Sequence, residues 1–533
     1  MSQRLRKSSY WQDAPHARHQ LVLIPTTIEE SIPADHPVRM VDEILDLIDW
    51  TSWESKYHGA FGQPPIHPSI MCKIWIFALI RRIRSSRQVE YALKHSIDFM
   101  WLSSGRTVDH GTLCTFRKNN SDELKKVFRS LITHAIDLGV ANLSELCVDG
   151  TRVLANANKY KTWTVGRLEK FLVELDAQLN SALSALEQKD ETDNELYGDE
   201  NPAQQLPAHL ASMQARKEEL AKHLENLKAM DRARSKQGKD AKENPAQIPK
   251  TDPDSRILPN KEGGYAANYT PMATTETRNG FIIDATVEIG NVEHTQLPSI
   301  IERVEQLHDV KVESALVDTA YTNGENLRFA EQSGLDLVGP IAGVKCTDNP
   351  AIREDVTQSV SLEDAAKLPI NPQTKRFDKS AFVYDADNDC YYCPAGKPMA
   401  HRYTEQHDQG YKKVERKTYT CNGCKGCPLS NLCRKDPNAK KGREVQRDPF
   451  ETLRDQHRQK MSGESAKKAY SRRQHFGETP FAVLKGLFGI RQFLLRGIEG
   501  VNQEWLWGAT SFNMHKLIGI LRRQRMAAAN AAV

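Results

Sequence analysis

Two short apolar runs that each end in aspartate constrain the fold of this chain more than any other feature. Residues 146–148 (LCV) lead into Asp149, and residues 315–317 (ALV) lead into Asp318. Runs of this length and composition predict strands. Two strands of one sheet that both end in Asp would bring their carboxylates together. The Asp149-Gly150 pair also predicts a two-residue hairpin turn, and such a turn would present Asp149 at the end of the sheet.

A third acid lies on a predicted helix late in the chain. Glu478 and Lys485 are two helical turns apart and therefore share one face. Carboxylates that converge need a counter-charge, and Mg²⁺ supplies it through few carboxylates plus phosphate oxygens. Two such ions (Mg²⁺ or Mn²⁺) would activate an attacking oxygen and stabilise the leaving one at phosphorus. Each acid alone is more often a cap, turn or solvated residue, but the three in this order predict a phosphoryl-transfer site.

The pattern changes several times along the chain, which is long enough for about three domains at 533 residues. Counting the strand that ends at Asp149 first, and continuing after residue 263, the order strand-strand-strand-helix-strand-helix-strand predicts a mixed α/β sheet. The predicted regions are an N-terminal helical domain (1–140), the first strands (141–157), a helical hairpin with its linker (158–262), the rest of the sheet (263–345), a cysteine-rich insertion (346–448) and C-terminal helices (449–533).

The N-terminal region and the hairpin are both predicted to be helical, for different reasons. Several short helices, the last from about Asp109, suit a helix-turn-helix-like DNA reader, with a plain helical packing domain as the alternative. Between residues 168 and 227, leucines at 4-3 spacing predict an antiparallel coiled-coil arm. The Lys-rich tract 232–250 that follows predicts a flexible linker.

The charge balance is compatible with nucleic acid but does not demonstrate it. The 73 Lys and Arg against 69 Asp and Glu give a net charge of +4, so local clusters carry more information. Lys485 is the first candidate for a phosphate contact because it shares a face with Glu478. The alternative explanation for basic residues on such a helix is that they provide solubility or pair with nearby acids. The candidate DNA-binding side chains are Lys485, Arg472, Arg473, Arg491, Arg117 and Lys118.

The chain carries no signal for secretion or for a membrane. Its basic N-terminus lacks an apolar stretch behind it, and its longest apolar run, 74–80, is too short to cross a bilayer. We therefore expect a cytoplasmic protein without membrane contact. In that compartment thiols stay reduced, and clustered cysteines indicate metal rather than disulfides.

Six of the ten cysteines form one cluster. Their order is Cys390-x2-Cys393, then Cys421-x2-Cys424-x2-Cys427-x5-Cys433. Paired CxxC motifs predict a zinc-ribbon-like module, in which four thiolates hold one structural Zn²⁺ and two of the six are spare. A disulfide or an iron–sulfur cluster is the alternative.

Taken together, these segments resemble bacterial insertion-sequence transposases with an RNase H-like DDE catalytic domain. The resemblance covers most of the chain outside the predicted arm. The matching pieces are residues 67–103 with VDHGTLCTFRK (108–118), VDGTRVLANA (148–157), ANYTPMATTETRNGFIIDATV (267–287), ALVDTAYTNGENL (315–327) and the segment 481–517. The resemblance implies an RNase H-like mixed sheet with flanking helices, and it implies that Asp149, Asp318 and Glu478 are the DDE triad.

The family's glutamate motif is Tyr, two residues, Arg, three residues, Glu, six residues, Lys. Glu478 and Lys485 match the last interval, whereas Tyr470 and Arg473 lie one residue too far upstream of Glu478. Because of this different spacing, the family roles of Tyr470 and Arg473 do not transfer directly to this chain. The fallback candidates for the third acid are Glu499 and Glu504.

The resemblance also implies which thiols hold zinc and what the chain does. The implied zinc ligands are Cys393, Cys424, Cys427 and Cys433, with Cys390 and Cys421 as competitors. The implied function is a DNA transposase that binds terminal inverted repeats as a homo-oligomer, frees a 3′-OH by hydrolysis and joins it to target DNA. The alternatives are an RNase H-like nuclease without strand transfer and a non-catalytic, transposase-derived DNA-binding protein. The presence of all three acids argues against the last.

Overall fold

The computed structural model divides the chain into two compact units. The described residues are 27–57, 64–197, 208–236, 243–260, 263–343, 349–408 and 413–531. One unit comprises the residues up to Glu123 with those from Met514 onward, and the other runs from Leu124 to Asn513. The predicted turn of the arm (198–207) and part of the predicted linker (237–242) lie outside the described residues.

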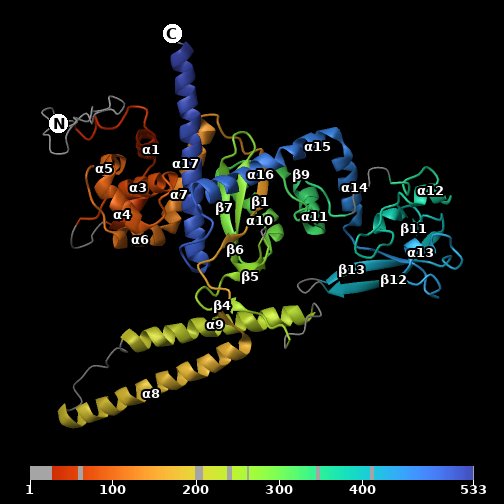
Figure 1. The fold of residues 1–533 in the computed structure, drawn as a ribbon, viewed down its shortest axis with the longest axis horizontal. Coiled ribbons are helices and arrows are strands. Elements are labelled where there is room, and N and C mark those ends of the chain that lie inside the picture. Colours follow the sequence, from red (N-terminus) through yellow and green to blue (C-terminus); the bar gives the residue numbers. More distant parts are fainter. Residues whose placement is uncertain are drawn as a thin grey trace, which may run out of the picture. The chain divides into compact units, whose positions relative to one another are not determined.

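The first unit is helical, as predicted. Its helices in Figure 1 are α1 (Pro37–Asp46), α2 (Thr51–Glu54), α3 (Pro68–Ile80), α4 (Ser86–His95), α5 (Ile97–Leu102) and α6 (His110–Asn119), with the 3-10 turn η1 (Ser55–Tyr57). α3 forms its core because its sequence is apolar on nearly every face, and Trp75 and Phe77 are fully buried. α3 starts after His67 and α6 after Asp109, and both side chains accept backbone N–H groups at the helix start.

The second unit contains the mixed sheet that the sequence predicted. Its strands are β1 (Glu145–Gly150), β2 (Val153–Leu154), β5 (Arg256–Pro259), β6 (Tyr265–Glu276), β7 (Ile282–Glu288), β8 (Ser314–Leu316) and β9 (Asp336–Val338). β6 is the longest, and it pairs antiparallel with β1, β2, β5 and β7. β1, β8 and β9 are parallel neighbours. The central order is therefore β7-β6-β1-β8-β9.

The predicted hairpin turn at Asp149-Gly150 is wrong. Gly150 is the last residue of β1 and is paired with Met272 of β6, and Val153 of β2 is paired with Tyr269 of the same strand. β1 and β2 thus follow each other along one partner instead of folding back on each other. The long β6 offers backbone partners to both segments, and this pairing overrides the local turn signal.

Helices cover the sheet and close the second unit. They are α7 (Ser121–Asp137), which starts in the first unit, α10 (Leu297–His308), α11 (Gly324–Ser333), α14 (Glu451–Ser462), α15 (Glu464–Ser471), α16 (Arg473–Ala482), the π-helical turn η4 (Val483–Leu487) and α17 (Gly497–Ala531). The first part of α17 packs on β7, where the side chain of Asn513 exchanges two hydrogen bonds with the backbone of Ile282 at 2.7 and 2.8 Å. The late helix that was predicted to carry both Glu478 and Lys485 starts at Arg473 as α16, and it gives way to η4 before Lys485.

The predicted arm is a pair of long antiparallel helices, α8 (Val165–Tyr197) and α9 (Ala208–Lys236) (Figure 1). Lys228 of α9 pairs with Glu169 of α8 at 3.2 Å, and the leucines at 168, 175, 220 and 227 are buried between the helices. The predicted flexible linker is partly wrong, because β4 (Ile248–Pro249) pairs with β3 (Thr162–Trp163) and buries Ile248 at the base of the arm.

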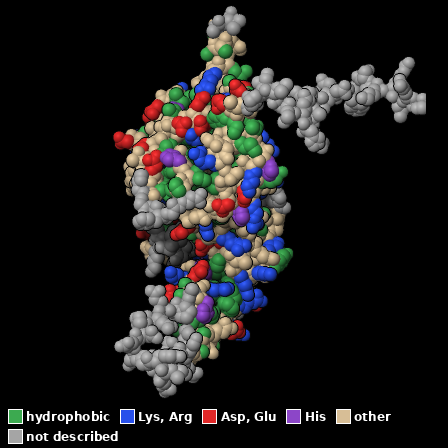
Figure 2. Space-filling view, turned by 90° about the vertical axis from the view of Figure 1, so that its left-hand side faces the viewer, with side chains coloured by type: hydrophobic (Ala, Val, Ile, Leu, Met, Phe, Trp, Pro, Cys, Tyr) green, Lys and Arg blue, Asp and Glu red, His purple; other side chains and the backbone are tan. Residues whose placement is uncertain are grey.

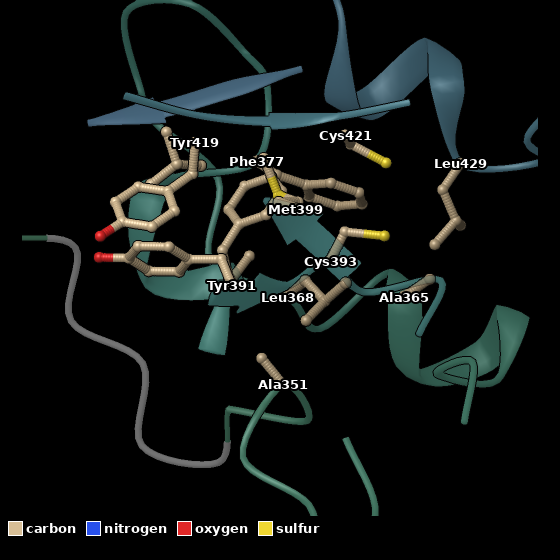
Figure 3. Packing of buried hydrophobic residues seen from close by; sticks show 13 residues of the cluster. Ala351, Ala365, Leu368, Phe377, Tyr391, Cys393, Met399, Tyr419, Cys421 and Leu429 are labelled. Carbon is tan, nitrogen blue, oxygen red and sulfur yellow. The ribbon is translucent and has the colours of Figure 1, made fainter. Parts of the chain in front are cut away.

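The cysteine-rich segment forms a separate five-stranded antiparallel sheet. Its strands, in spatial order, are β10 (Val383–Asp385), β11 (Cys390–Tyr392), β12 (Pro398–Asp408), β13 (Lys413–Cys421) and β14 (Glu444–Arg447). Its core is aromatic, with Phe377, Tyr391 and Tyr419 fully buried beside Met399 (Figure 3). Across the described residues, the structure has no helix with the length and apolar character needed to span a membrane.

Candidate active site

The three acids singled out in the sequence face one cavity. Asp149 is the penultimate residue of β1, Asp318 follows β8 closely, and Glu478 lies in α16. All three line a cavity of about 790 Å³ in the second unit. β1 and β8 are parallel, so their carboxyl ends meet at the same edge of the sheet, which is where α/β proteins bind ligands. Asp149 is 9% exposed, whereas Glu478 is open to solvent.

A glycine lets α16 lie close enough to β1 to deliver Glu478 to this cavity. A Cβ built on Gly477 would lie 3.2 Å from Asp149 Oδ2 and 3.4 Å from Cys147 Sγ. Thr275 of β6 donates to the carbonyl oxygen of Phe476 at 2.9 Å and fixes the same turn of helix. Burial, followed by the charge of Asp149, raises the pKa of the Cys147 thiol to about 12, so Cys147 stays neutral and packs against α16.

Arg473 supplies the counter-charge to the two strand-end carboxylates. Its Nη2 lies 2.9 Å from Asp149 Oδ2 and 4.0 Å from Asp318 Oδ2. Burial disfavours the charged guanidinium, but Asp149, Cys147 and Asp318 outweigh burial and raise the pKa of Arg473 above its ordinary value. Although Arg473 departs from the family spacing, it is thus part of this site.

The other basic residues predicted near Glu478 have distinct placements. Lys485 lines the cavity, but its Nζ donates to Thr151 Oγ1 at 2.6 Å and to the carbonyl oxygen of Arg152 at 2.7 Å. Arg491 lines the cavity and is exposed. Arg472 pairs with Glu145 at 2.7 Å instead. Lys485 and Arg491 therefore border the acids, and Arg472 is engaged elsewhere.

In the first unit, Arg117 and Lys118 are neighbours with opposite exposure. Arg117 is 6% exposed, lies 4.6 Å from the centre of the Trp75 ring and donates to the carbonyl oxygen of Arg84 at 2.8 Å. These contacts are structural, and they do not support the predicted phosphate contact of Arg117. Lys118 is exposed. On the face shown in Figure 2, Lys and Arg side chains lie among acidic and apolar ones and do not form one uniform patch.

Two further groups lie beside the three acids, and the sequence analysis missed both. Glu293 lines the same cavity. Tyr321 is 1% exposed, and burial, followed by the charges of Asp149, Glu293 and Asp318, raises the pKa of its hydroxyl above the ordinary value. Tyr321 could have been noticed because it follows Asp318 by three residues. Glu293 carried no sequence signal, since it lies in an irregular stretch before a predicted helix.

The fallback acids do not reach the cavity. Glu504 is buried, and its Oε2 accepts the backbone N–H groups of Leu494 and Leu495 at 2.8 and 2.9 Å. Glu499 is exposed at the start of α17 and does not line the cavity. The geometry therefore favours Glu478 over both.

The clustered cysteines gather at a second, much smaller cavity of about 20 Å³. It is lined by five thiols, those of Cys393, Cys421, Cys424, Cys427 and Cys433. Cys393 and Cys421 project their sulfur atoms to the same side, toward Leu429 (Figure 3). Cys390 does not line this cavity, because it lies on β11 opposite Ala400. Of the two competitors, Cys421 thus joins the predicted four and Cys390 does not.

The thiols differ in acidity. The hydrogen bond with Cys421 lowers the pKa of Cys393 to about 6, helped by the backbone N–H groups of Lys397 and Ala395. These contacts outweigh burial, which by itself would raise the pKa. Burial raises the pKa of Cys433 to about 12. Cys393 is therefore the thiol most readily available as a thiolate, the form that binds metals.

Neither cluster has its donors drawn together to metal-binding distances. Within the described ranges, no group of three or more His, Cys, Asp or Glu side chains is arranged to hold a metal ion. At the acidic cavity, Arg473 lies against the oxygens that an ion would use. No disulfide joins the nine cysteines that the structure describes.

Comparisons with known proteins give two family matches. Residues 392–518 match the family model "Transposase DDE domain". The matched segment starts at the end of β11 in the cysteine-rich sheet and includes Glu478 and Lys485. Residues 26–119 match the model "Transposase domain (DUF772)", which covers most of the helical unit. A comparison with curated proteins found no match. The two family matches thus identify an N-terminal transposase domain and a transposase DDE domain in this chain, the domains of insertion-sequence transposases, and the DDE domain belongs to a family of enzymes that catalyse phosphoryl transfer.

Proposed function

We propose that this transposase binds the terminal inverted repeats of its element and catalyses cut-and-paste transposition with Asp149, Asp318 and Glu478 as its catalytic triad. The observation that carries the proposal is that these three acids, from β1, the loop after β8 and α16, face one cavity. The family match covers Glu478 but neither Asp, so the shared cavity is the main support for the two aspartates.

We infer an RNase H-like core from the sheet that holds the acids. Three strands, β7, β6 and β1, are antiparallel, and β8 and β9 then extend the sheet in parallel. The aspartates lie at the ends of its first and fourth strands in chain order, counting β1, β6, β7 and β8. This arrangement supports an RNase H-like sheet.

The chemistry of the donors around the cavity suits hard divalent cations, Mg²⁺ or Mn²⁺. All three triad side chains offer carboxylate oxygens, and the cavity is open enough to admit substrate phosphate oxygens as further ligands. Two ions held there would supply the positive charge that activates the attacking oxygen and stabilises the leaving one. Arg473 would have to give up its contact with Asp149 Oδ2 when a cation binds.

The proposed reaction has two displacements at phosphorus. In the first, a water oxygen forms a bond to phosphorus while the bond to the 3′ oxygen of the element breaks, which leaves a 3′-OH on the element and a 5′-phosphate on the flank. In the second, that 3′ oxygen attacks a target phosphodiester, and the target strand leaves with its own 3′-OH. Arg491, which is exposed and lines the cavity, would contact a backbone phosphate.

The remaining parts of the proposal concern DNA and zinc. The helical unit, through Lys118 rather than Arg117, would contact the terminal repeats, and a homo-oligomer would assemble on them.

One structural Zn²⁺ would be held in the small cavity by the thiols of Cys393, Cys424, Cys427 and Cys433, with Cys421 as the alternative ligand. The cavity has room for one atom-sized guest, and thiolates suit this ion.

Nicking of supercoiled plasmid that carries the element ends tests the triad. We expect nicking with Mg²⁺ by the wild-type chain and none above background by Asp149→Ala or Asp318→Ala. Equal nicking by all three proteins would show that the triad assignment is wrong. A pre-cleaved end with a free 3′-OH then separates the two enzymatic functions, because a transposase joins it to target DNA and a nuclease without strand transfer does not.

A further inference from the structure

A fourth carboxylate, that of Glu293, faces the cavity of the triad. Glu293 opens the 3-10 turn η2 (Glu293–Thr295) between β7 and α10, and its side chain is 20% exposed. A Cβ built on Gly150, the residue after Asp149, would lie 3.7 Å from Glu293 Cγ. Glu293 therefore packs directly beside the end of β1.

The charge of Glu293 is only partly compensated. Its Oε1 lies 3.5 Å from Arg152 Nη2, beyond a normal hydrogen bond, and Arg152 also binds Thr270 and Asn291. Its Oε2 is buried and has no hydrogen-bond partner in the part of the chain that the structure describes. A buried polar atom without a hydrogen bond is destabilising, most of all on a charged group, so a ligand at this oxygen would be stabilising.

Tyr321 provides a second, independent sign of a ligand at this point. Its backbone N–H donates to the carbonyl oxygen of Asp318 at 3.1 Å, and its hydroxyl is buried and has no hydrogen-bond partner among the described residues. A phenol in such a place can donate to a carboxylate or to a ligand-bound water once the acids are drawn together.

The fold holds Glu293 and Tyr321 in place through one side chain. Asn326 Nδ2 donates at 2.8 Å to the carbonyl oxygen of His294 and at 2.8 Å to that of Tyr321. Asn326 lies in α11, directly after the loop that carries Asp318. The turn that bears Glu293 is therefore tied to the loop of the catalytic Asp.

We propose that Glu293 is a fourth carboxylate of the divalent-metal site and that the Tyr321 hydroxyl positions these carboxylates. The proposal rests on the proposed triad and extends it by residues outside the DDE motif. A plain salt bridge with Arg152 would leave Oε2 unsatisfied, whereas a Mg²⁺ or Mn²⁺ ion, or a water that it carries, would satisfy it. Oxygen donors of this kind match both ions.

Direct measurement of Mn²⁺ binding to the full chain tests this proposal. Titration followed by electron paramagnetic resonance should show that Glu293→Gln weakens Mn²⁺ binding by about tenfold or more, the range found when support of a metal site is removed. Glu302→Gln, an exposed glutamate of α10, is the matched control and should bind as wild type. Tyr321→Phe should weaken binding by a smaller factor without changing the charge.

The outcomes separate this proposal from that of the triad. If Asp149→Asn weakens Mn²⁺ binding and both Glu293→Gln and Tyr321→Phe bind as wild type, the triad stands and the fourth carboxylate is wrong. If Asp149→Asn also binds as wild type, the proposed triad itself fails. Circular dichroism checks that each variant is folded, and if Glu293→Gln does not fold, wild-type binding by folded Tyr321→Phe overturns the proposal.

Discussion

The acidic cavity and the thiol cavity are both built from possible metal ligands, but they are opposite in design. The acidic cavity is large, about 790 Å³, and its acids come from elements far apart in the chain. The thiol cavity is small, about 20 Å³, and its five cysteines fall within one short segment around a hydrophobic core. An open site with oxygen donors suits an exchangeable ion that meets substrate, whereas a closed thiol site suits a structural ion.

This comparison explains how each site depends on the rest of the fold. The acids meet only because β1, β8 and α16 are packed together, so catalysis should be sensitive to small shifts of α16. The thiols lie at the end of β13, on the short helix α13 (Ser430–Cys433) and on the turns that follow β11 and β13, so their site should form with the cysteine-rich sheet alone.

Asp149→Asn should produce the largest effect and should be confined to the acidic cavity. The change keeps the shape but removes the charge, and we expect DNA nicking to fall by at least about a thousandfold, roughly 4 kcal/mol. Thermal unfolding and zinc content should stay at wild-type values. A parallel loss of zinc would show that the two sites are not independent.

Cys427→Ser tests the other side of the comparison. We expect the zinc content, measured by atomic emission, to fall from one ion per chain to none, and the free energy of unfolding of the cysteine-rich sheet to fall on the order of several kcal/mol. Limited proteolysis should then cleave this segment first. Cys390→Ser is the matched control, because Cys390 does not line the cavity. Wild-type protein without zinc would contradict the proposed structural ion.

Gly477→Ala should impair catalysis without unfolding the protein. The added methyl group meets Asp149 Oδ2 at 3.2 Å and Cys147 Sγ at 3.4 Å, so the Asp149 carboxylate or α16 must shift by a few tenths of an ångström. We expect nicking to fall by about ten- to a hundredfold, because small misplacements of catalytic groups have effects of this size. Gly519→Ala in α17 is the control, since its nearest neighbour would be Arg523 Nη1 at 3.8 Å. Equal activity of both variants would contradict the role of close helix packing.

Arg473→Ala should have the smallest effect, and its sign is informative. If the guanidinium competes with a cation for Asp149 and Asp318, its removal should tighten Mn²⁺ binding by about three- to tenfold, near 1 kcal/mol. Isothermal titration calorimetry gives the affinity without relying on activity. Weaker binding would instead show that Arg473 orients the carboxylates for the ion.

Much of the site could be predicted from the sequence because its signals are local. An apolar run that ends in Asp depends only on neighbouring residues, and so does the spacing of Glu478 and Lys485 or of the cysteines. The mixed sheet and the helical first unit followed from periodicity in the same way. Glu293 could not be found, because nothing near it in the chain marks it and only the packing of η2 beside Gly150 brings it to the cavity.

The sequence by itself thus determined which residue types were available and on which elements they lie. Tertiary structure decided which of them meet. It replaced the hairpin at Asp149-Gly150 with a continuous path along β6, because a long strand satisfies backbone groups on both β1 and β2. It buried Arg117 against Trp75 and chose Cys421 over Cys390 for the thiol cavity. Strand pairing and burial depend on residues that are distant in the chain, and local sequence patterns do not predict which distant residues these are.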